Sequence, residues 1–495
     1  MGHPSSTLCG CQGRNTNQPS WCSIVLLYWN PSFCALTKAV QASRTMNKRT
    51  FIKLGSAAAA SPFVSPMFAW ASKEKLTNWA GNLEYGTEQV TSAASQTEVQ
   101  KFVKEHGSFK VLGTRHCFND IANTSSEFLS LKPQDKVVAL DAKARTVTIE
   151  AGMTYGRLAP YLHQNGFALH NLASLPHISV AGACSTATHG SGEKNGNLST
   201  AVSALQMVLA SGEVRTLSRE KDGETFHGAV VGLGALGVIT KLTLDLQPTF
   251  TMQQYVYEDL PLDQLTKNFD AIEAAGYSVS LFTDWQKPRI NEVWIKSRIN
   301  DDAEHKFEAW PLFYGAKLAT RNLHPIIELS AENCTEQMGV PGPWYERLPH
   351  FRMGFTPSAG KELQSEYFVP RQHAVDAILA VQRLNEMVSP HLLITEIRTI
   401  AADDLWMSPA YKQPSVAIHF TWKQDWPAVS KALPVIEKEL TPFGVRPHWG
   451  KLFAISREQL KTRYKKLPEF VGLCNQFDPK GKFRNTFLNR NIFGT

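Results

Sequence analysis

Several features that this 495-residue chain lacks exclude classes of structure and function. None of its eight cysteines forms a CxxC pair, the usual spacing of a structural zinc site, so no metal is expected. Its apolar run at 24–29 is far shorter than the roughly 20 residues that a membrane helix needs, so no stable membrane insertion is expected. There is no internal repeat. The sequence does not decide whether two of the four cysteines after residue 45 form a disulfide.

Acidic residues are missing from the first 71 positions, which carry six basic ones. The formal charge of the whole chain is +7, so only +1 is left for the rest. A nearly neutral body offers no electrostatic reason to expect nucleic acid as a partner.

Residues 46–71 have the pattern of an export signal. A basic start at 48–53 is followed by an Ala- and Phe-rich stretch and by Ala69-Trp70-Ala71, a small-residue cleavage pattern. The basic string resembles a twin-arginine signal with one arginine replaced by lysine. We therefore expect a periplasmic or exported protein, with the cytoplasm as the second possibility. Residues 1–45 are either upstream of a true start at Met46 or a real extension.

Short helical and strand-like patterns alternate from residue 78 onward, which predicts an α+β fold. The spacing predicts a helix over 97–106 with Thr97 and Gln100 as its capping box, then a strand over 109–112. A second helix is predicted over 155–165. After Pro248 the chain becomes richer in aromatic and charged residues, which indicates a different domain.

The segment 232–237 matches G-x-G-x-x-G, the fingerprint of a dinucleotide-binding Rossmann fold. That fingerprint needs a strand before the glycines and a helix after them. Here a helical pattern precedes the glycines over 224–231, and a strand pattern follows over 238–246. We therefore interpret the match as fortuitous.

Three runs of small, hydroxylated and glycine residues each surround a histidine, at 113–120, 174–179 and 186–192. Such runs let backbone N–H groups approach a phosphate or a flat ring closely. Together they predict a binding site for one large anionic cofactor.

These runs resemble the flavin-binding half of the vanillyl-alcohol-oxidase superfamily and, within it, the alditol oxidases. The resemblance extends from about residue 77 to 489 and includes 333–337, 340–344 and 477–485. It implies a two-part FAD-binding domain of the PCMH type and an α+β substrate domain. The implied division is 72–250 for the FAD domain, 251–440 for the substrate domain and 441–495 for a segment that returns to the FAD domain.

The resemblance implies that His116 is bonded covalently to FAD, whereas a loop histidine alone would be taken as structural. Arg115 and Cys117 depart from the family's usual small residue and serine. The cofactor-binding residues that the resemblance implies are Gly113, Thr114, Arg115, His116, Cys117, Ser174, Ser179, Gly182, Thr186, Ala187, Thr188, His189, Ile239, His448 and Lys451.

The strand pattern at 393–400 places Glu396 and Arg398 on one face, because side chains alternate with a period of two. A surface ion pair on an edge strand is the alternative interpretation. The pattern at 417–422 places His419 and Thr421 together in the same way.

The resemblance implies that Glu396 and Arg398 hold the terminal hydroxyls of a polyol. It implies that Ser174, Gln364 and Thr421 bind further hydroxyls. His419 is the expected proton acceptor because an unperturbed histidine titrates near neutrality. Lys451 is expected near the flavin ring, so the expected catalytic residues are Glu396, Arg398, His419 and Lys451.

The expected activity is oxidation of the terminal primary alcohol of alditols such as xylitol and sorbitol, with O₂ reduced to hydrogen peroxide by a monomer. The alternative enzyme is a sugar-1,4-lactone oxidase or dehydrogenase of the same superfamily. A non-catalytic sugar-binding protein is a third possibility, which the flavin-like loops disfavour.

Overall fold

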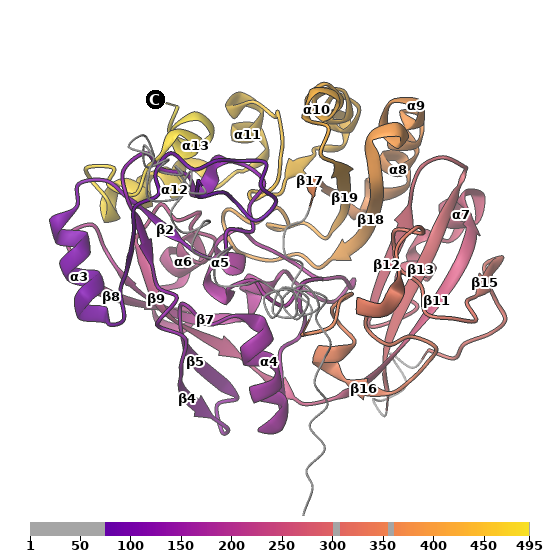
Figure 1. The fold of residues 1–495 in the computed structure, drawn as a ribbon, viewed down its shortest axis with the longest axis horizontal. Coiled ribbons are helices and arrows are strands. Elements are labelled where there is room, and N and C mark those ends of the chain that lie inside the picture. The colour runs from indigo at the N-terminus through magenta and orange to yellow at the C-terminus, as the bar shows by residue number, and fades with distance from the viewer. Residues whose placement is uncertain (1–74, 300–306, 355–360, 495) are drawn as a thin grey trace, which may run out of the picture. The chain divides into compact units, whose positions relative to one another are not determined.

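Two large antiparallel sheets dominate the computed structural model, which describes residues 75–299, 307–354 and 361–494 (Figure 1). The predicted export signal and residues 1–45 lie outside the described residues. Sheet and helix are mixed along the chain, which confirms the predicted α+β class. None of the described helices is long and apolar enough to cross a membrane.

The first half of the described chain, up to about residue 250, holds a small parallel sheet and a five-stranded antiparallel sheet. The small sheet has the order β1-β3-β2, with β1 Val90–Ser92, β2 Lys110–Leu112 and β3 Phe128–Ser130. The larger one has the order β4-β5-β9-β7-β8, with β4 Val137–Asp141, β5 Thr146–Glu150, β7 Val202–Val208, β8 Val214–Ser218 and β9 Val238–Asp245. The helices are α3 Gln96–Glu105, α4 Tyr155–Gln164, α5 Val180–Ser185 and α6 Arg219–Val230.

The predicted start of α3 was wrong. Ser95, not Thr97, is the N-cap, and its hydroxyl accepts from Glu98 N at 3.2 Å. The Glu98 carboxylate accepts from Ala94 N at 2.8 Å, so Ser95 and Glu98 satisfy two otherwise unpaired donors at the helix start. Thr97 lies inside the helix instead.

The glycine-rich segment 232–237 follows helix α6 and precedes strand β9, so it lacks the order of a Rossmann fingerprint. Leu233 and Gly234 form a tight turn with φ of 53° and 64°. The turn contacts the small sheet, because Nζ of buried Lys110 donates to Gly234 O at 3.0 Å.

The second half is one ten-stranded antiparallel sheet whose central order is β11-β13-β12-β18-β19-β17-β20. Helices α7, α8 and α10 pack on one face of it (Figure 1). The strands are β11 Thr251–Pro261, β12 Ser278–Thr283, β13 Arg289–Ile299, β14 Leu312–Phe313, β15 Ala316–Leu318, β16 Gly342–Pro343, β17 Glu362–Pro370, β18 Leu392–Ile400, β19 Ser415–Lys423 and β20 Arg446–Pro447. The helices are α7 Leu262–Glu273, α8 Ala374–Gln382, α9 Asn385–Val388 and α10 Trp426–Leu440.

The C-terminal segment ends against the first half. Strand β20 still pairs with β17, so the large sheet extends past residue 440. Helices α11 Arg457–Arg463, α12 Leu467–Phe477 and α13 Thr486–Leu488 follow. The amide of Asn485 donates to the carbonyl oxygens of Asp120, Ile121 and Asn123 at 2.8–3.2 Å, which ties the segment to the loop after His116.

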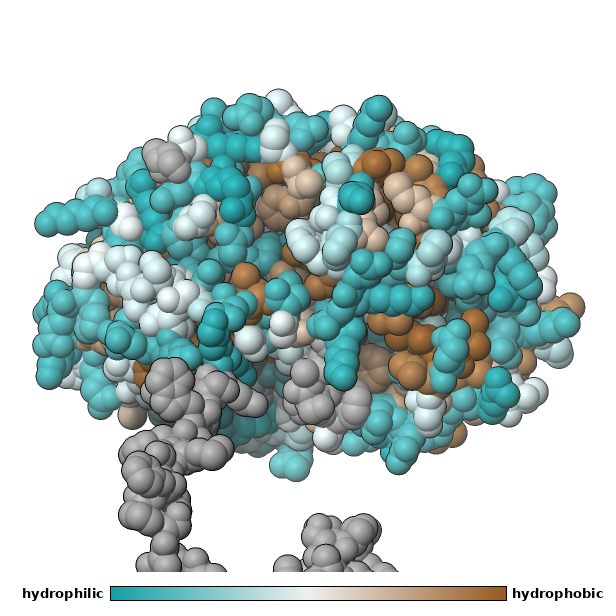
Figure 2. All heavy atoms as spheres, turned by 45° about the horizontal axis from the view of Figure 1, so that its top comes forward, coloured by the Kyte–Doolittle hydropathy of each residue, from teal (hydrophilic) through white to brown (hydrophobic). Residues whose placement is uncertain are grey.

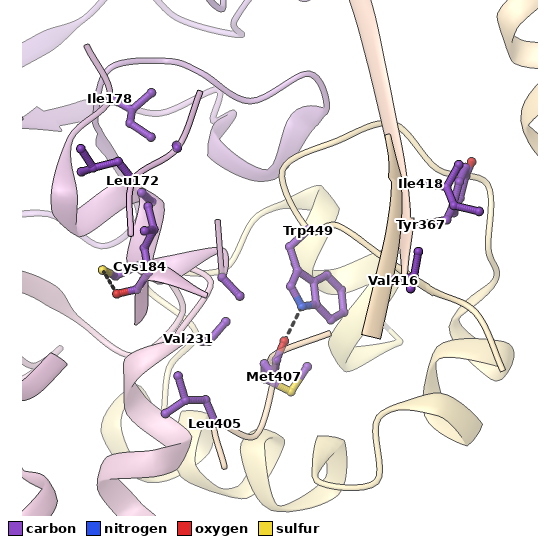
Figure 3. Close-up of a cluster of buried hydrophobic side chains, with 14 of the residues drawn as sticks. Leu172, Ile178, Cys184, Val231, Tyr367, Leu405, Met407, Val416, Ile418 and Trp449 are labelled. Carbon is purple, nitrogen blue, oxygen red and sulfur yellow. Dashed lines mark hydrogen bonds between the residues drawn. The ribbon is translucent and has the colours of Figure 1, made fainter. Parts of the chain in front are cut away.

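One apolar core joins the two halves. Figure 3 shows Trp449 between Val231 of the first half and Val416 and Ile418 of β19, with its indole N–H donating to Met407 O at 2.7 Å. The described residues pack as one compact unit. Hydrophilic residues cover most of the face in Figure 2, and hydrophobic ones appear there only in separate areas.

Candidate functional site

A row of polar side chains crosses the face of the large sheet opposite to α7, α8 and α10. Glu396 of β18 lies directly across from His419 of β19, which lies across from Glu366 of β17. Partners directly opposite each other point to the same face. The same register places Thr421 beside Gln364, so the structure brings these predicted substrate residues together. Glu396 and Arg398 are only 5% and 6% exposed, which excludes the surface ion pair.

Arg398 is held between two carboxylates. Its Nη2 donates to Glu366 Oε1 at 2.7 Å, and its Nε lies 3.5 Å from Glu396 Oε1. Burial alone would raise the pKa of both carboxyls. Instead, Arg398 and His350 hold the pKa of Glu396 well below its usual range, and His189 and Arg398 do the same for the pKa of Glu366. Both are therefore carboxylates at neutral pH.

A hydrogen-bond chain fixes the orientation of His419. Lys451 Nζ donates to Gln364 Oε1, and Gln364 Nε2 donates to Glu362. Since His419 Nε2 lies 3.1 Å from the same Gln364 oxygen, Nε2 carries the ring hydrogen and Nδ1 carries the lone pair. Burial lowers the pKa of His419 to about 3. The ring is neutral and presents Nδ1 as its acceptor.

His116 lies in an aromatic group at the loop after β2. Its ring centroid is 4.6 Å from that of Trp79 and 5.0 Å from that of His177. Its Nδ1 is buried without a hydrogen-bond partner among the described residues. Burial, helped by the positive charge of Lys451, lowers the pKa of His116 well below its usual value. The result is a neutral imidazole with a free nitrogen, as a nucleophile requires.

Two exposed glycines flank the hydroxyl of Ser179. A Cβ at Gly182 would stand 2.8 Å from Ser179 Oγ, and one at Gly113 would stand 3.2 Å from it. Thr114 Oγ1 accepts from Ser179 N at 3.3 Å, which joins the first loop to the start of α5. Together with the free nitrogen of His116, these residues fit a flat, anionic cofactor such as FAD that approaches the backbone closely.

Gly113, Ser179, Gly182 and His116 are called the cofactor cradle below. The other predicted cofactor residues come from several elements of the chain. Thr186 and Thr188 share a hydrogen bond of 3.3 Å across Ala187, whose φ is 55°. Ile239 of β9 is half-buried and packs against the same core cluster as Ala181 of α5. His448 Nδ1 accepts from Gly450 N at 3.0 Å, and burial lowers the pKa of its ring to about 3. Arg115 has a φ of 64°, and its carbonyl oxygen accepts from Trp79 N at 2.9 Å.

His189, also predicted to bind the cofactor, contacts the substrate sheet. It is 2% exposed, and its Nε2 lies 3.0 Å from Glu366 Oε1. Its Nδ1 lies 2.8 Å from Gly190 O. It therefore connects the third glycine-rich run to the substrate sheet. Ser174, predicted to contact cofactor and substrate, is half-buried, and its carbonyl accepts from Phe351 N at 3.4 Å.

Sequence reasoning missed three residues that support this site. Glu366 lies two positions after Gln364 in the same strand, so the period of two could have found it. His350 comes from a loop, and Lys296 comes from a strand far away in sequence. No pattern in the sequence links either of them to Glu396.

Two family models match the two halves of the chain. The FAD binding domain matches residues 87–218, and the D-arabinono-1,4-lactone oxidase family matches residues 356–491. The first range contains the cradle around His116 and Ser179. The second contains Gln364, Glu396 and Lys451.

Two curated relatives and one solved structure match over nearly their full length. An alditol oxidase from Streptomyces sp. is 46% identical over 83% of this chain and 98% of its own. An L-gulono-1,4-lactone dehydrogenase from Mycobacterium tuberculosis is 25% identical over 84% and 98%. A carbohydrate oxidase from Microdochium nivale, solved with a substrate analogue, has the same fold, with a TM-score of 0.67 at 14% identity over 88% of this chain and 98% of that one.

Proposed function

The chain belongs to the alditol oxidase family of FAD-linked oxidases, and we propose that it oxidises the terminal primary alcohol of acyclic polyols such as xylitol and sorbitol to the aldose. The observation that carries this proposal is the buried Arg398 between Glu366 and Glu396, which gives a fixed pair of opposite charges for hydroxyl groups. Polyols present only hydrogen-bonding edges, which suits this set of side chains.

In this proposal, Glu396 and Arg398 bind the terminal hydroxyls. Among the described residues, no donor reaches Oε2 of Glu396 and no acceptor reaches Nη1 of Arg398. Glu396 can therefore accept a hydrogen bond while Arg398 donates one. Ser174, Gln364 and Thr421 would bind hydroxyls further along the polyol.

His419 would take the hydroxyl proton through Nδ1, because the Gln364 chain keeps the hydrogen on Nε2. FAD, when bound, supplies the two-electron acceptor that removes the hydride and passes the electrons to O₂. Lys451 places a positive charge beside Gln364, and its ammonium lies 4.6 Å from the ring centroid of Phe118 in the cofactor loop.

Three finer features belong to the same proposal. His116 would hold FAD covalently, supported by its neutral imidazole and free Nδ1. Hydrogen peroxide would be the product of O₂ reduction. The basic segment and cleavage pattern at 46–71 support export to the periplasm or beyond, and the proposed oligomeric state is a monomer.

A lactone oxidoreductase is the weaker alternative. The lactone dehydrogenase is 25% identical to the chain, whereas the alditol oxidase is 46% identical over a similar span. The family model that matches 356–491 is named for a lactone oxidase, but the alditol oxidase and the lactone dehydrogenase each match more than four-fifths of the chain, so this match alone does not separate the two activities.

An oxygen-uptake screen with a peroxide assay tests the proposal. We expect xylitol and sorbitol to drive O₂ consumption with one equivalent of hydrogen peroxide. Aldono-1,4-lactones should give at most a small fraction of that rate. A lactone that outpaces every polyol would replace the proposal with the alternative.

A further inference from the structure

Glu396 is supported from behind by a histidine and a lysine that the proposed reaction does not use. His350 Nε2 lies 2.7 Å from Glu396 Oε1, and His350 Nδ1 lies 3.2 Å from Lys296 Nζ. His350 is 6% exposed and Lys296 is 0% exposed. The three groups form a continuous chain from the core of the sheet to the substrate face.

The ring of His350 is clamped in one orientation. Its centroid lies 5.4 Å from that of Phe282 and 5.3 Å from that of Trp294, with both aromatic rings nearly perpendicular to it. Phe282 lies directly across from Glu396 in the sheet, and Trp294 lies on the next strand. The imidazole therefore has little freedom to turn away from the carboxylate.

The hydrogen-bond partners of its two ring nitrogens determine the tautomer of His350. Glu396 is ionised, so a bare Nε2 at 2.7 Å would place two lone pairs against each other. Nε2 therefore carries the hydrogen, and Nδ1 accepts from Lys296. Lys296 Nζ also donates to Leu348 O at 2.6 Å and to Pro349 O at 3.1 Å, so its three hydrogens match three acceptors.

The loop that carries His350 also contacts the other half of the site. The next residue, Phe351, donates its N–H to Ser174 O at 3.4 Å, and Ser174 is a proposed polyol-binding residue. The chain from Lys296 to Glu396 thus ends where the substrate would lie between the two halves.

We propose that Lys296 and His350 are positioning residues that hold Glu396 Oε1 and leave Oε2 as a fixed, ionised acceptor for the polyol hydroxyl. This inference rests on the proposed role of Glu396 in polyol oxidation. Four charged or titratable groups face Glu396: Arg398 of its own strand, His419 of β19, His350 of the loop and Lys296 of β13. Removing His350 takes away one of the two strongest influences that keep the carboxyl ionised.

The tautomer can be measured without any substrate. ¹⁵N NMR of histidine-labelled holoenzyme should show His350 with a protonated Nε2 and an unprotonated Nδ1, assigned by comparison with H350Q. The opposite tautomer would overturn the proposal. This result does not depend on polyol activity, so the proposed function can fail while the positioning pair stands.

Kinetics then test the consequence. We expect H350F, which keeps the aromatic packing, to lower the limiting rate of anaerobic flavin reduction by xylitol roughly 10-fold to 100-fold. In the pH profile of kcat/KM, the acid limb should move to higher pH, because the pKa of Glu396 rises when His350 is removed. H350Q should recover most of the rate, since its amide N–H can replace Nε2–H, and K296M should lose less than H350F.

A matched control separates positioning from structure. His391 forms a similar histidine–carboxylate pair with Asp425 at 2.8 Å, but it lies at a partly exposed position before β18. H391Q should leave the rate and the acid limb unchanged. If H350F lowers the melting temperature but keeps the parental acid limb, the pair is only structural and the proposal is wrong. Parent enzyme that oxidises no polyol would refute the proposed function instead.

Discussion

The cofactor loops and the substrate sheet differ in how many of their buried polar groups have partners within the chain. Around His116, the described contacts leave His116 Nδ1, both nitrogens of His177 and Trp79 Nε1 buried without partners. Around Glu396, the carboxylates of Glu366 and Glu396 and the amide of Gln364 each have at least one partner within the chain, and Arg398 Nε is the buried atom of this cluster without a hydrogen bond among the described residues. Buried unpartnered groups are costly, so they mark the place where another polar group is needed.

This difference separates two kinds of binding site. The substrate sheet is organised by the chain itself, through charges that fix one another before any polyol arrives. The cofactor loops offer free atoms and exposed glycines, as a site for a large, permanently held group does. Disrupting the substrate sheet should therefore slow the reaction, whereas disrupting the cofactor loops should change how the flavin is bound.

The largest expected effect is at His116. We predict that His116→Ala has no covalently bound flavin, because the free Nδ1 is the proposed point of attachment. Acid-denatured protein on a gel under ultraviolet light should be fluorescent for the parent and dark for the variant. His163, which bonds Thr249 at the surface, is the control, and His163→Ala should stay fluorescent. A parent whose colour washes off completely would contradict covalent attachment.

The next largest effect is at the charged pair of the substrate sheet. We predict that Arg398→Ala and Glu396→Gln each lower kcat/KM for xylitol by roughly two to four orders of magnitude, measured by anaerobic flavin reduction. Arg398→Ala also leaves Glu366 and Glu396 without their shared cation, so the pKa of both carboxyls should rise.

The flavin spectrum should be retained in both variants, because the cofactor loops lie in the other half. The control is Arg215→Ala, which removes an arginine from a more exposed pair with Glu213 and should leave kcat/KM unchanged. If both sheet variants reduce flavin at the parental rate, the chemistry takes place elsewhere.

Much of this organisation was predictable because it depends on local pattern. The period of two in β18 and β19 placed Glu396 with Arg398 and His419 with Thr421, and the register of the sheet then brought them together. Glycine-rich runs predicted the cradle because close backbone approach needs small residues.

Long-range contacts were not predictable in the same way. His350 and Lys296 reach Glu396 through packing that no short segment encodes. The pKa of His419 is lowered by burial and further affected by the charges of Glu366, Lys451 and Arg398, which come from other strands and the C-terminal segment. The true cap of α3 was missed because Ser95-x-x-Glu98 competed with a second plausible capping pair two residues later.

A smaller effect is expected on stability at Glu273, on the helical side of the sheet. This carboxyl is 0% exposed, with one oxygen accepting from Thr399 Oγ1 at 3.1 Å and the other unpartnered. Burial raises its pKa to about 8. The folded state therefore keeps a proton that the unfolded state releases above about pH 4.5, so stability falls as pH rises from about 5 to 8.

Glu273→Gln should remove this loss, because a neutral amide still accepts from Thr399. We predict a free energy of unfolding on the order of 1–3 kcal/mol above that of the parent at pH 8, and little difference at pH 5. Urea denaturation at both pH values measures it. Glu213→Gln, at an exposed carboxylate, should show no such pH-dependent gain. Equal stability of Glu273→Gln and parent at pH 8 would mean that the carboxyl is solvated.

The smallest expected effect is at Cys117, which follows His116 directly. A Cβ added at Gly450 would stand 3.5 Å from the sulfur of Cys117, so the thiol lies close to Gly450. The backbone oxygen of Cys117 accepts from Asn78 Nδ2 at 2.7 Å. Burial raises the pKa of the thiol to about 11, so it stays protonated and is a poor nucleophile toward flavin. A serine hydroxyl fills nearly the same volume, and the backbone contact does not depend on the side chain. We therefore predict that Cys117→Ser keeps its flavin and changes kcat/KM by less than about two-fold, measured by oxygen uptake with xylitol. Loss of flavin from Cys117→Ser, with His116 intact, would show that the cofactor loop needs the thiol itself and that His116 alone does not hold the cofactor.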